Sequence, residues 1–240
     1  MFERYRLSAL ACLLVAFALV APFRAQAAET FELRAIRDAR PPIEQLVSAL
    51  KARDIFAAKA ALENYDTAWR GIEVYASTRD RNLYQSELTI REQISSGLAM
   101  RIPDTASLLV SAQSLLTTRD ALLALVAKKP PLHPLFDDVS RLRAFRAKLR
   151  VVDIALRAAD FGKARVAFDR FNGDFYTVKG ILQARSPQVL EAVTKGTAQL
   201  QAELKSNKPD AMKAMSYILA MMLKYNEVLN LVTHGAKTQP

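Results

Sequence analysis

The sequence contains very little cysteine, histidine and glycine, and each shortage excludes a class of chemistry. In 240 residues there are one cysteine, two histidines and seven glycines. Cys12 lies in an N-terminal apolar stretch, so a chain that loses that stretch has no disulfide, thiolate metal site, cysteine-linked haem or cysteine nucleophile. His133 and His234 have no partner at metal-ligand spacing. Glycine-rich phosphate loops, Gly-x-Ser-x-Gly elbows and His-Glu-x-x-His elements are also missing, and we expect a protein that is not an enzyme.

The N-terminus has the order of a secretory signal peptide. Two arginines among the first six residues precede an unbroken apolar stretch over residues 7–21 and a small-residue series over residues 25–28. The apolar stretch is shorter than the ~20 residues that span a bilayer core. We predict that residues 1–27 are a signal peptide cleaved after Ala27, that the mature chain has no transmembrane segment, and that it resides in the periplasm. Cleavage after Ala28 and an uncleaved anchor are the alternatives.

The charge is basic. The whole chain carries 34 Lys and Arg against 24 Asp and Glu, a formal net charge of +10, of which the predicted signal peptide holds only a small part. A basic exported protein can meet anionic lipid, a polyanion or an acidic protein partner. We expect no nucleic-acid ligand outside the cytoplasm. Runs rich in Ala and Leu with few glycines favour helices throughout.

The mature chain matches itself at an offset of 106 residues. The segment Ala49-Leu50-Lys51-Ala52-Arg53-Asp54 aligns with Ala155-Leu156-Arg157-Ala158-Ala159-Asp160, and Pro103-Asp104 aligns with Pro209-Asp210. Helix starts and apolar positions keep this one offset from end to end, which indicates an internal duplication. Chance similarity between two Ala- and Leu-rich helical segments is the alternative.

Each copy is predicted to form four helices. Apolar spacing gives helices over about 43–53, 56–80, 82–100 and 104–127, and then 135–159, 161–185, 187–206 and 209–233. Three prolines in the segment 128–134 prevent a regular helix there. We therefore predict an all-α protein of two tandem antiparallel four-helix bundles, residues 28–127 and 135–240, joined by a Pro-rich linker.

Comparing the copies separates packing from function. The last helix carries four methionines that could suggest a copper site, but their counterparts are mostly leucines, so we predict that they fill core positions. The four are Met212, Met215, Met221 and Met222, opposite Ala106, Leu109, Leu115 and Leu116.

An acidic set occurs only in the first copy. On one helix Tyr65, Trp69 and Ile72 share a core stripe, while Asp66, Arg70 and Glu73 form a polar stripe beside it. The next helix carries Glu87, whose counterpart is Val193. With Asp66 nearby, Glu73 and Glu87 could hold a hard divalent cation such as iron. The alternative is ordinary i,i+4 ion pairs, Asp66 with Arg70 and Glu87 with Arg91.

This segment resembles the imelysin family of bacterial envelope proteins. The likeness consists of Arg70-Gly71-Ile72-Glu73 inside an aromatic helix of a duplicated, exported helical protein. Family members carry a His-x-x-Glu element on a bundle helix and are associated with iron acquisition. The resemblance implies a metal-related role in which Glu73 is the family glutamate, although Arg70 stands in place of the histidine. The helical extracytoplasmic extensions of iron permeases are a looser likeness.

A basic helix offers a second site. Arg143, Arg146 and Arg150 lie on one face of the helix that begins near residue 135, and an ordinary solvated face is the alternative. Two functions follow as hypotheses. The first is a binding or accessory protein for metal uptake, centred on Glu73 and Glu87 in the first copy, with Trp69 and Arg70 as further candidate binding residues. The second is an envelope scaffold that holds a protein partner on the basic helix or in the groove between the bundles.

Overall fold

Residues 29–238 are described by a computed structural model, and every regular element among them is an α-helix. The helices are α2 Phe31–Asp38, α3 Arg40–Lys51, α4 Ile55–Arg79, α5 Arg81–Ala99, α6 Thr105–Val126, α7 Leu135–Arg157, α8 Phe161–Gly173, α9 Tyr176–Arg185, α10 Pro187–Lys205 and α11 Ala211–Thr238. The predicted all-α fold class is confirmed. The predicted signal peptide lies outside the described residues.

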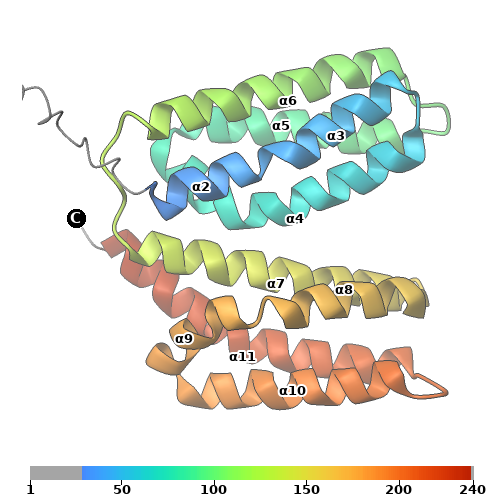
Figure 1. Cartoon of the computed structure of the whole chain (residues 1–240), viewed down its shortest axis with the longest axis vertical. Coiled ribbons are helices and arrows are strands. Elements are labelled where there is room, and N and C mark those ends of the chain that lie inside the picture. The colour runs from blue at the N-terminus through green and yellow to red at the C-terminus, as the bar shows by residue number, and fades with distance from the viewer. Residues whose placement is uncertain (1–28, 239–240) are drawn as a thin grey trace, which may run out of the picture. The chain divides into compact units, whose positions relative to one another are not determined.

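The helices pack in two groups connected by residues 127–134, which form no helix (Figure 1). We call α2–α6 the N-terminal group and α7–α11 the C-terminal group. In the N-terminal group α3 and α5 each pack against both α4 and α6, and in the C-terminal group α11 packs against α7 and α10, with α8 against α7. Arg79, at the end of α4, donates hydrogen bonds to the Glu32 carboxylate and, at 2.8 Å, to the Pro130 carbonyl. This anchors the connecting segment to the N-terminal group.

Helix boundaries in the C-terminal group repeat those of the N-terminal group at an offset of 106. The bounds of α5, Arg81–Ala99, become those of α10, Pro187–Lys205, and α4 and α9 end at equivalent positions. The turns before α4 and α8 also match, because Arg53 and Ala159 are the only non-glycine residues of the described chain with positive φ, 57° and 55°. The next residue in each turn is an aspartate that caps the following helix by accepting a backbone hydrogen bond.

Two helices differ from the sequence prediction. The helix predicted over 161–185 is broken in two, because α8 ends at Gly173 and α9 begins at Tyr176. The sequence Asn172-Gly173-Asp174 has low helix propensity, which accounts for the break. The helix predicted from residue 43 begins earlier, at Arg40, and is preceded by α2. Two consecutive prolines after Arg40 lack the N–H groups that would join α2 and α3 into one helix.

One close helix pair, α4 and α7, joins the two groups. Gly71 in the middle of α4 faces α7, where an added Cβ would lie 3.1 Å from the Ala144 Cβ and 3.6 Å from the Ser140 carbonyl oxygen. The missing side chain therefore allows the two helices to approach this closely. Farther along the same contact, the Tyr75 hydroxyl donates a 2.7 Å hydrogen bond to Asp137. Burial and this acceptor both raise the pKa of Tyr75.

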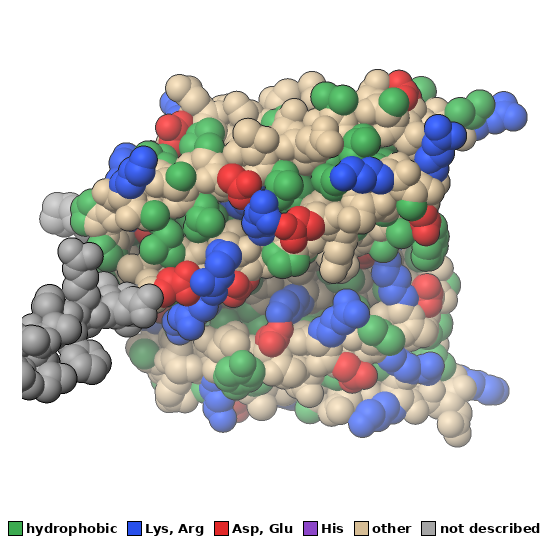
Figure 2. Space-filling view, turned by 45° about the horizontal axis from the view of Figure 1, so that its top comes forward, with side chains coloured by type: hydrophobic (Ala, Val, Ile, Leu, Met, Phe, Trp, Pro, Cys, Tyr) green, Lys and Arg blue, Asp and Glu red, His purple; other side chains and the backbone are tan. Residues whose placement is uncertain are grey.

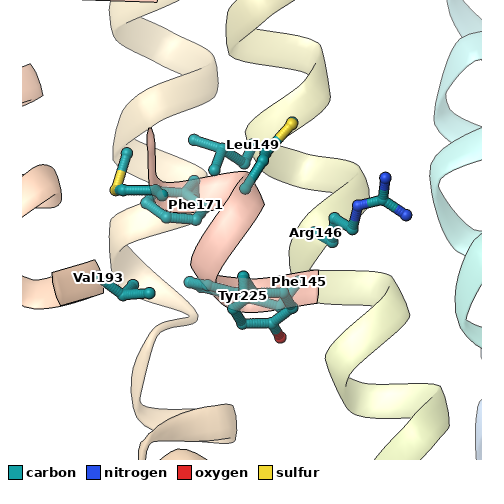
Figure 3. A pocket seen from close by; sticks show the side chains of 8 residues that line it. Phe145, Arg146, Leu149, Phe171, Val193 and Tyr225 are labelled. Carbon is teal, nitrogen blue, oxygen red and sulfur yellow. The ribbon is translucent and has the colours of Figure 1, made fainter. Parts of the chain in front are cut away.

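The core of the C-terminal group is aromatic and contains methionine. Phe145, Phe171 and Tyr225 surround a cavity of about 10 Å³ that Met221 and Met222 also line (Figure 3). Met221 is buried, as predicted, and fills the space left by a glycine on α10.

The prediction that all four methionines are core residues is wrong for Met212, whose side chain is 73% exposed. It lies two residues before the buried Ala214 and therefore on the other side of α11.

Within the described residues α6 is the one helix with the length and hydropathy of a membrane span. It packs against α3 and α5 and contributes Leu108, Leu115 and Leu122 to the core. It also carries the fully buried charge of Arg119. One face of α6 therefore packs against neighbouring helices, as in a helical bundle.

Candidate binding groove

A groove of about 730 Å³ lies where the C-terminal half of α4 meets α7 and α11. We call it the arginine groove. Five arginines line it, namely Arg70 from α4 and Arg143, Arg146, Arg150 and Arg157 from α7. The rest of the wall combines apolar side chains, including Ile154, Met222 and Leu229, with the acidic or polar side chains of Glu73, Asp153, Asn230 and Thr233. Five of the eight residues singled out in the sequence, from both hypotheses, therefore lie in one place: Arg70, Glu73, Arg143, Arg146 and Arg150.

The row of arginines arises from the helical repeat of α7. Leu142, Phe145, Leu149 and the apolar residues that follow at the same spacing are buried in the core, so the intervening basic residues face outward. Figure 3 shows Arg146 turned away from the aromatic core, toward the N-terminal group. Positions 143, 146 and 150 place three guanidinium groups on one face over about 10 Å of helix.

Acidic residues neutralise only part of the arginine groove. Glu73 lies 3.5 Å from Arg70, and Asp153 lies 2.8 Å from Arg157. Glu73 also accepts a 3.3 Å hydrogen bond from the Tyr84 hydroxyl. Burial and the Glu73 charge raise the pKa of Tyr84.

Arg143, Arg146 and Arg150 form no ion pair within the described part of the chain. The arginine groove therefore keeps three uncompensated positive charges beside an apolar wall.

Asp66 and Trp69 lie outside the arginine groove. Asp66 accepts a 3.0 Å hydrogen bond from Arg91 Nε, so the predicted i,i+4 pair of Asp66 with Arg70 is wrong. Arg91 lies on the next helix and its guanidinium stacks 5.3 Å from the centre of the Trp69 ring. The Trp69 ring is fully buried and stacks on Tyr84, which makes it a packing residue at this position.

Glu87 is buried in an ion pair with Arg119 of α6, and not with Arg91 as the i,i+4 alternative predicts. Both side chains are 1% exposed. The Tyr65 hydroxyl donates to Glu87 and accepts from Arg119, and the Arg119 guanidinium lies over the rings of Tyr65 and Trp69. Burial raises the pKa of Glu87 to about 7, opposed by Arg119, and burial lowers the pKa of Arg119.

Arg119 is a buried charged residue that the sequence did not lead us to expect. It lies on the buried stripe of α6 between Leu115 and Leu122, and a charge at that helical spacing was the available signal. Its Nε and Nη1 atoms and the Trp69 Nε1 are buried without a hydrogen-bond partner. The buried polar cluster is thus only partly satisfied.

The three acidic residues predicted to hold a cation are each engaged by an arginine: Asp66 by Arg91, Glu73 by Arg70 and Glu87 by Arg119. An incoming cation would have to displace a positive charge at each. Over the residues that the structure describes, no group of three or more His, Cys, Asp or Glu side chains could hold a metal ion. The cation site remains a prediction from the sequence.

Comparisons with protein-family models, with curated proteins and with solved structures found no match. The likeness to the imelysin family therefore rests on the residues around Arg70 and Glu73 and on the helical layout.

Proposed function

We propose that this chain is an exported, non-enzymatic binding protein that holds an acidic segment of an envelope protein in the arginine groove. The observation that carries the proposal is the row of three unpaired arginines, Arg143, Arg146 and Arg150, along a concave and partly apolar wall. Guanidinium groups form paired hydrogen bonds with carboxylates, so a row of them selects acidic side chains at matching spacing. A concave site admits a peptide segment, whereas a flat membrane surface could not reach its floor.

We further propose that the chain arose by duplication of one four-helix bundle. The repeated helix bounds support this, and so does a repeated ion pair. Arg79 pairs with Glu32 in the N-terminal group, and Arg185 approaches Asp138 to 3.9 Å in the C-terminal group. Both members of the pair are related by the offset of 106.

The arginine groove is tested with a fluorescently labelled acidic peptide that carries glutamates at i, i+3 and i+7, measured by anisotropy. We expect saturable binding that weakens as salt is raised, because exposed charges contribute most of the attraction. Replacing Arg143, Arg146 and Arg150 together by glutamate should weaken binding by about 100-fold or more, since each lost charge-assisted pair contributes about 1 kcal/mol or more.

A matched control reverses three lysines on the far side of the C-terminal group, Lys195, Lys205 and Lys208, which changes the net charge by the same amount. All three are exposed. This variant should bind the peptide nearly as well as the parent protein. Equal losses in the two variants would show a response to net charge alone and would refute the groove.

A further inference from the structure

A second groove lies beside the N-terminal half of α4, whereas the arginine groove lies beside its C-terminal half. The second groove is bounded by α4 and α8, with α7 between them, and encloses about 1060 Å³. We call it the α4–α8 groove. It shares no lining residue with the arginine groove. Figure 2 shows a hollow between the two helical groups with basic and apolar side chains around it.

Apolar side chains dominate the wall of the α4–α8 groove. Phe56, Val166 and Tyr176 are 86%, 54% and 76% exposed, although side chains of this size are normally buried in a helical protein. Ala60 and Val151 continue the apolar surface between them. Large apolar residues that gather around one concavity indicate a site for an apolar ligand body.

Four basic and two acidic side chains line the α4–α8 groove, and they divide equally between its two ends. Near the end of α8, Lys148 pairs with Asp174, and Arg170 has no ion-pair partner among the described residues. The end as a whole therefore has one positive charge in excess. Burial and then the Arg170 charge lower the pKa of Lys148, which indicates a shared positive potential that a bound anion would relieve.

The other end of the groove also has one positive charge in excess, because Lys163 forms a 2.9 Å ion pair with Glu63 and the exposed Lys59 adds a second basic group. From Arg170 back to Lys163 the wall follows seven residues of α8, about 10 Å. The space is thus elongated, with a positive charge at each end and an apolar length between them.

We propose that the α4–α8 groove binds a single-chain fatty acid. The carboxylate lies between Arg170 and Lys148, and the acyl chain runs along Ala60, Val151 and Val166. One carboxylate matches the single excess charge at the Arg170 end, where the planar guanidinium suits a carboxylate better than the Lys59 ammonium at the other end does. A two-chain lipid would need a wider apolar surface, and a phosphate monoester would place a second negative charge beside Asp174.

The test is calorimetric titration of the purified, delipidated protein with laurate below its micelle concentration. We expect saturable binding of one laurate per chain and little heat from acetate or from the methyl ester of laurate. Arg170→Glu should weaken laurate binding by about tenfold or more, because the charged contact is replaced by repulsion. Val166→Glu, an exposed substitution in the apolar length, should weaken it similarly.

Arg150→Glu is the matched control, because it makes the same charge change on α7 within the arginine groove and should leave laurate binding unchanged. Helical circular dichroism of each variant shows that the fold is kept. The proposal fails if laurate gives no saturable heat, if Arg150→Glu weakens binding as much as Arg170→Glu, or if Val166→Glu binds laurate normally. Tighter binding of lysophosphatidylglycerol or of an acidic amphipathic peptide than of laurate would also overturn it. Each of these results is independent of peptide binding in the arginine groove.

Discussion

Glu87, Arg119 and Tyr65 form a buried ionic cluster in the N-terminal group. At the offset of 106 residues they correspond to Val193, Tyr225 and Phe171, which line the aromatic cavity of Figure 3. Under the proposed duplication, the two sets are an ionic and a mainly apolar solution to the same packing problem. A buried ion pair often gives no more stability than an apolar replacement of similar volume, whereas a single unpaired charge is strongly unfavourable.

The correspondence predicts the effect on stability of replacing Glu87, Arg119 and Tyr65 by the residue types of the C-terminal group. Glu87→Val alone should lower the free energy of unfolding by about 3–5 kcal/mol, because Arg119 is left buried without its partner. Adding Arg119→Tyr and Tyr65→Phe, which completes the set found in the C-terminal group, should restore most of that loss. Denaturant unfolding followed by circular dichroism measures both.

Glu73→Gln is the control for the swap, since Glu73 is only partly buried and its pair with Arg70 is long. It should change stability by less than about 1 kcal/mol. A triple variant as unstable as Glu87→Val would contradict the equivalence of the two sites.

The raised pKa of Glu87 predicts a pH dependence of stability. Its pKa of about 7 lies above the ordinary value of 4.5, so the folded protein holds this proton more tightly than the unfolded chain. The resulting stabilisation is complete below about pH 4.5 and is lost as the pH rises through about 7. Relative to Glu87→Gln, the parent protein should lose up to about 3 kcal/mol over that range. Parallel stability curves for the two proteins would exclude a titrating Glu87.

At the scale of the helices, the contact between α4 and α7 depends on Gly71. Gly71→Leu should destabilise the protein by about 1–3 kcal/mol, because the new side chain would meet Ala144 and Ser140. Gly180→Ala, at a helical glycine with open space around it, should instead stabilise by about 0.5–1 kcal/mol. Thermal unfolding of both variants compares them, and a neutral Gly71→Leu would show that the two helices do not pack closely there.

Helix positions were largely predictable from the sequence, and the exceptions have local causes. Apolar spacing placed α4–α7 and α10 to within about two residues at each end, while α11 extends five residues beyond its predicted end at 233. The break between α8 and α9 was missed because the apolar period continues through it, to Val178 and Leu182, despite Gly173. The apolar period indicates which helix face is buried. The break in the helix depends instead on the low helix propensity of the three residues 172–174.

The candidate site was only partly predictable, because side-chain partners depend on the packing between helices. Helical spacing correctly put Arg143, Arg146 and Arg150 on one exposed face. It paired Asp66 and Glu87 with arginines on their own helices, whereas both carboxylates reach arginines on neighbouring helices. Spacing within one helix defines which side chains are neighbours there, but contacts between helices require the arrangement of the whole group.

At the scale of the whole molecule, two separate grooves each carry an excess of positive charge. The arginine groove has three unpaired arginines and a partly apolar wall, and the α4–α8 groove has more apolar surface and one excess positive charge at each end. We propose a different anionic ligand for each. The junction of the two helical groups, more than either group alone, is where we place the function.

The most direct test of a binding site at this junction is a titration with the acidic peptide. The arginine Nε–Hε resonances are followed in nuclear magnetic resonance spectra. If the peptide binds in the arginine groove, the signals of Arg143, Arg146 and Arg150 should shift and saturate together. Arg165, which donates a 2.7 Å hydrogen bond to the Leu204 carbonyl elsewhere in the C-terminal group, should stay unchanged. Shifts spread evenly over all arginines, or confined to residues outside the arginine groove, would contradict peptide binding in that groove.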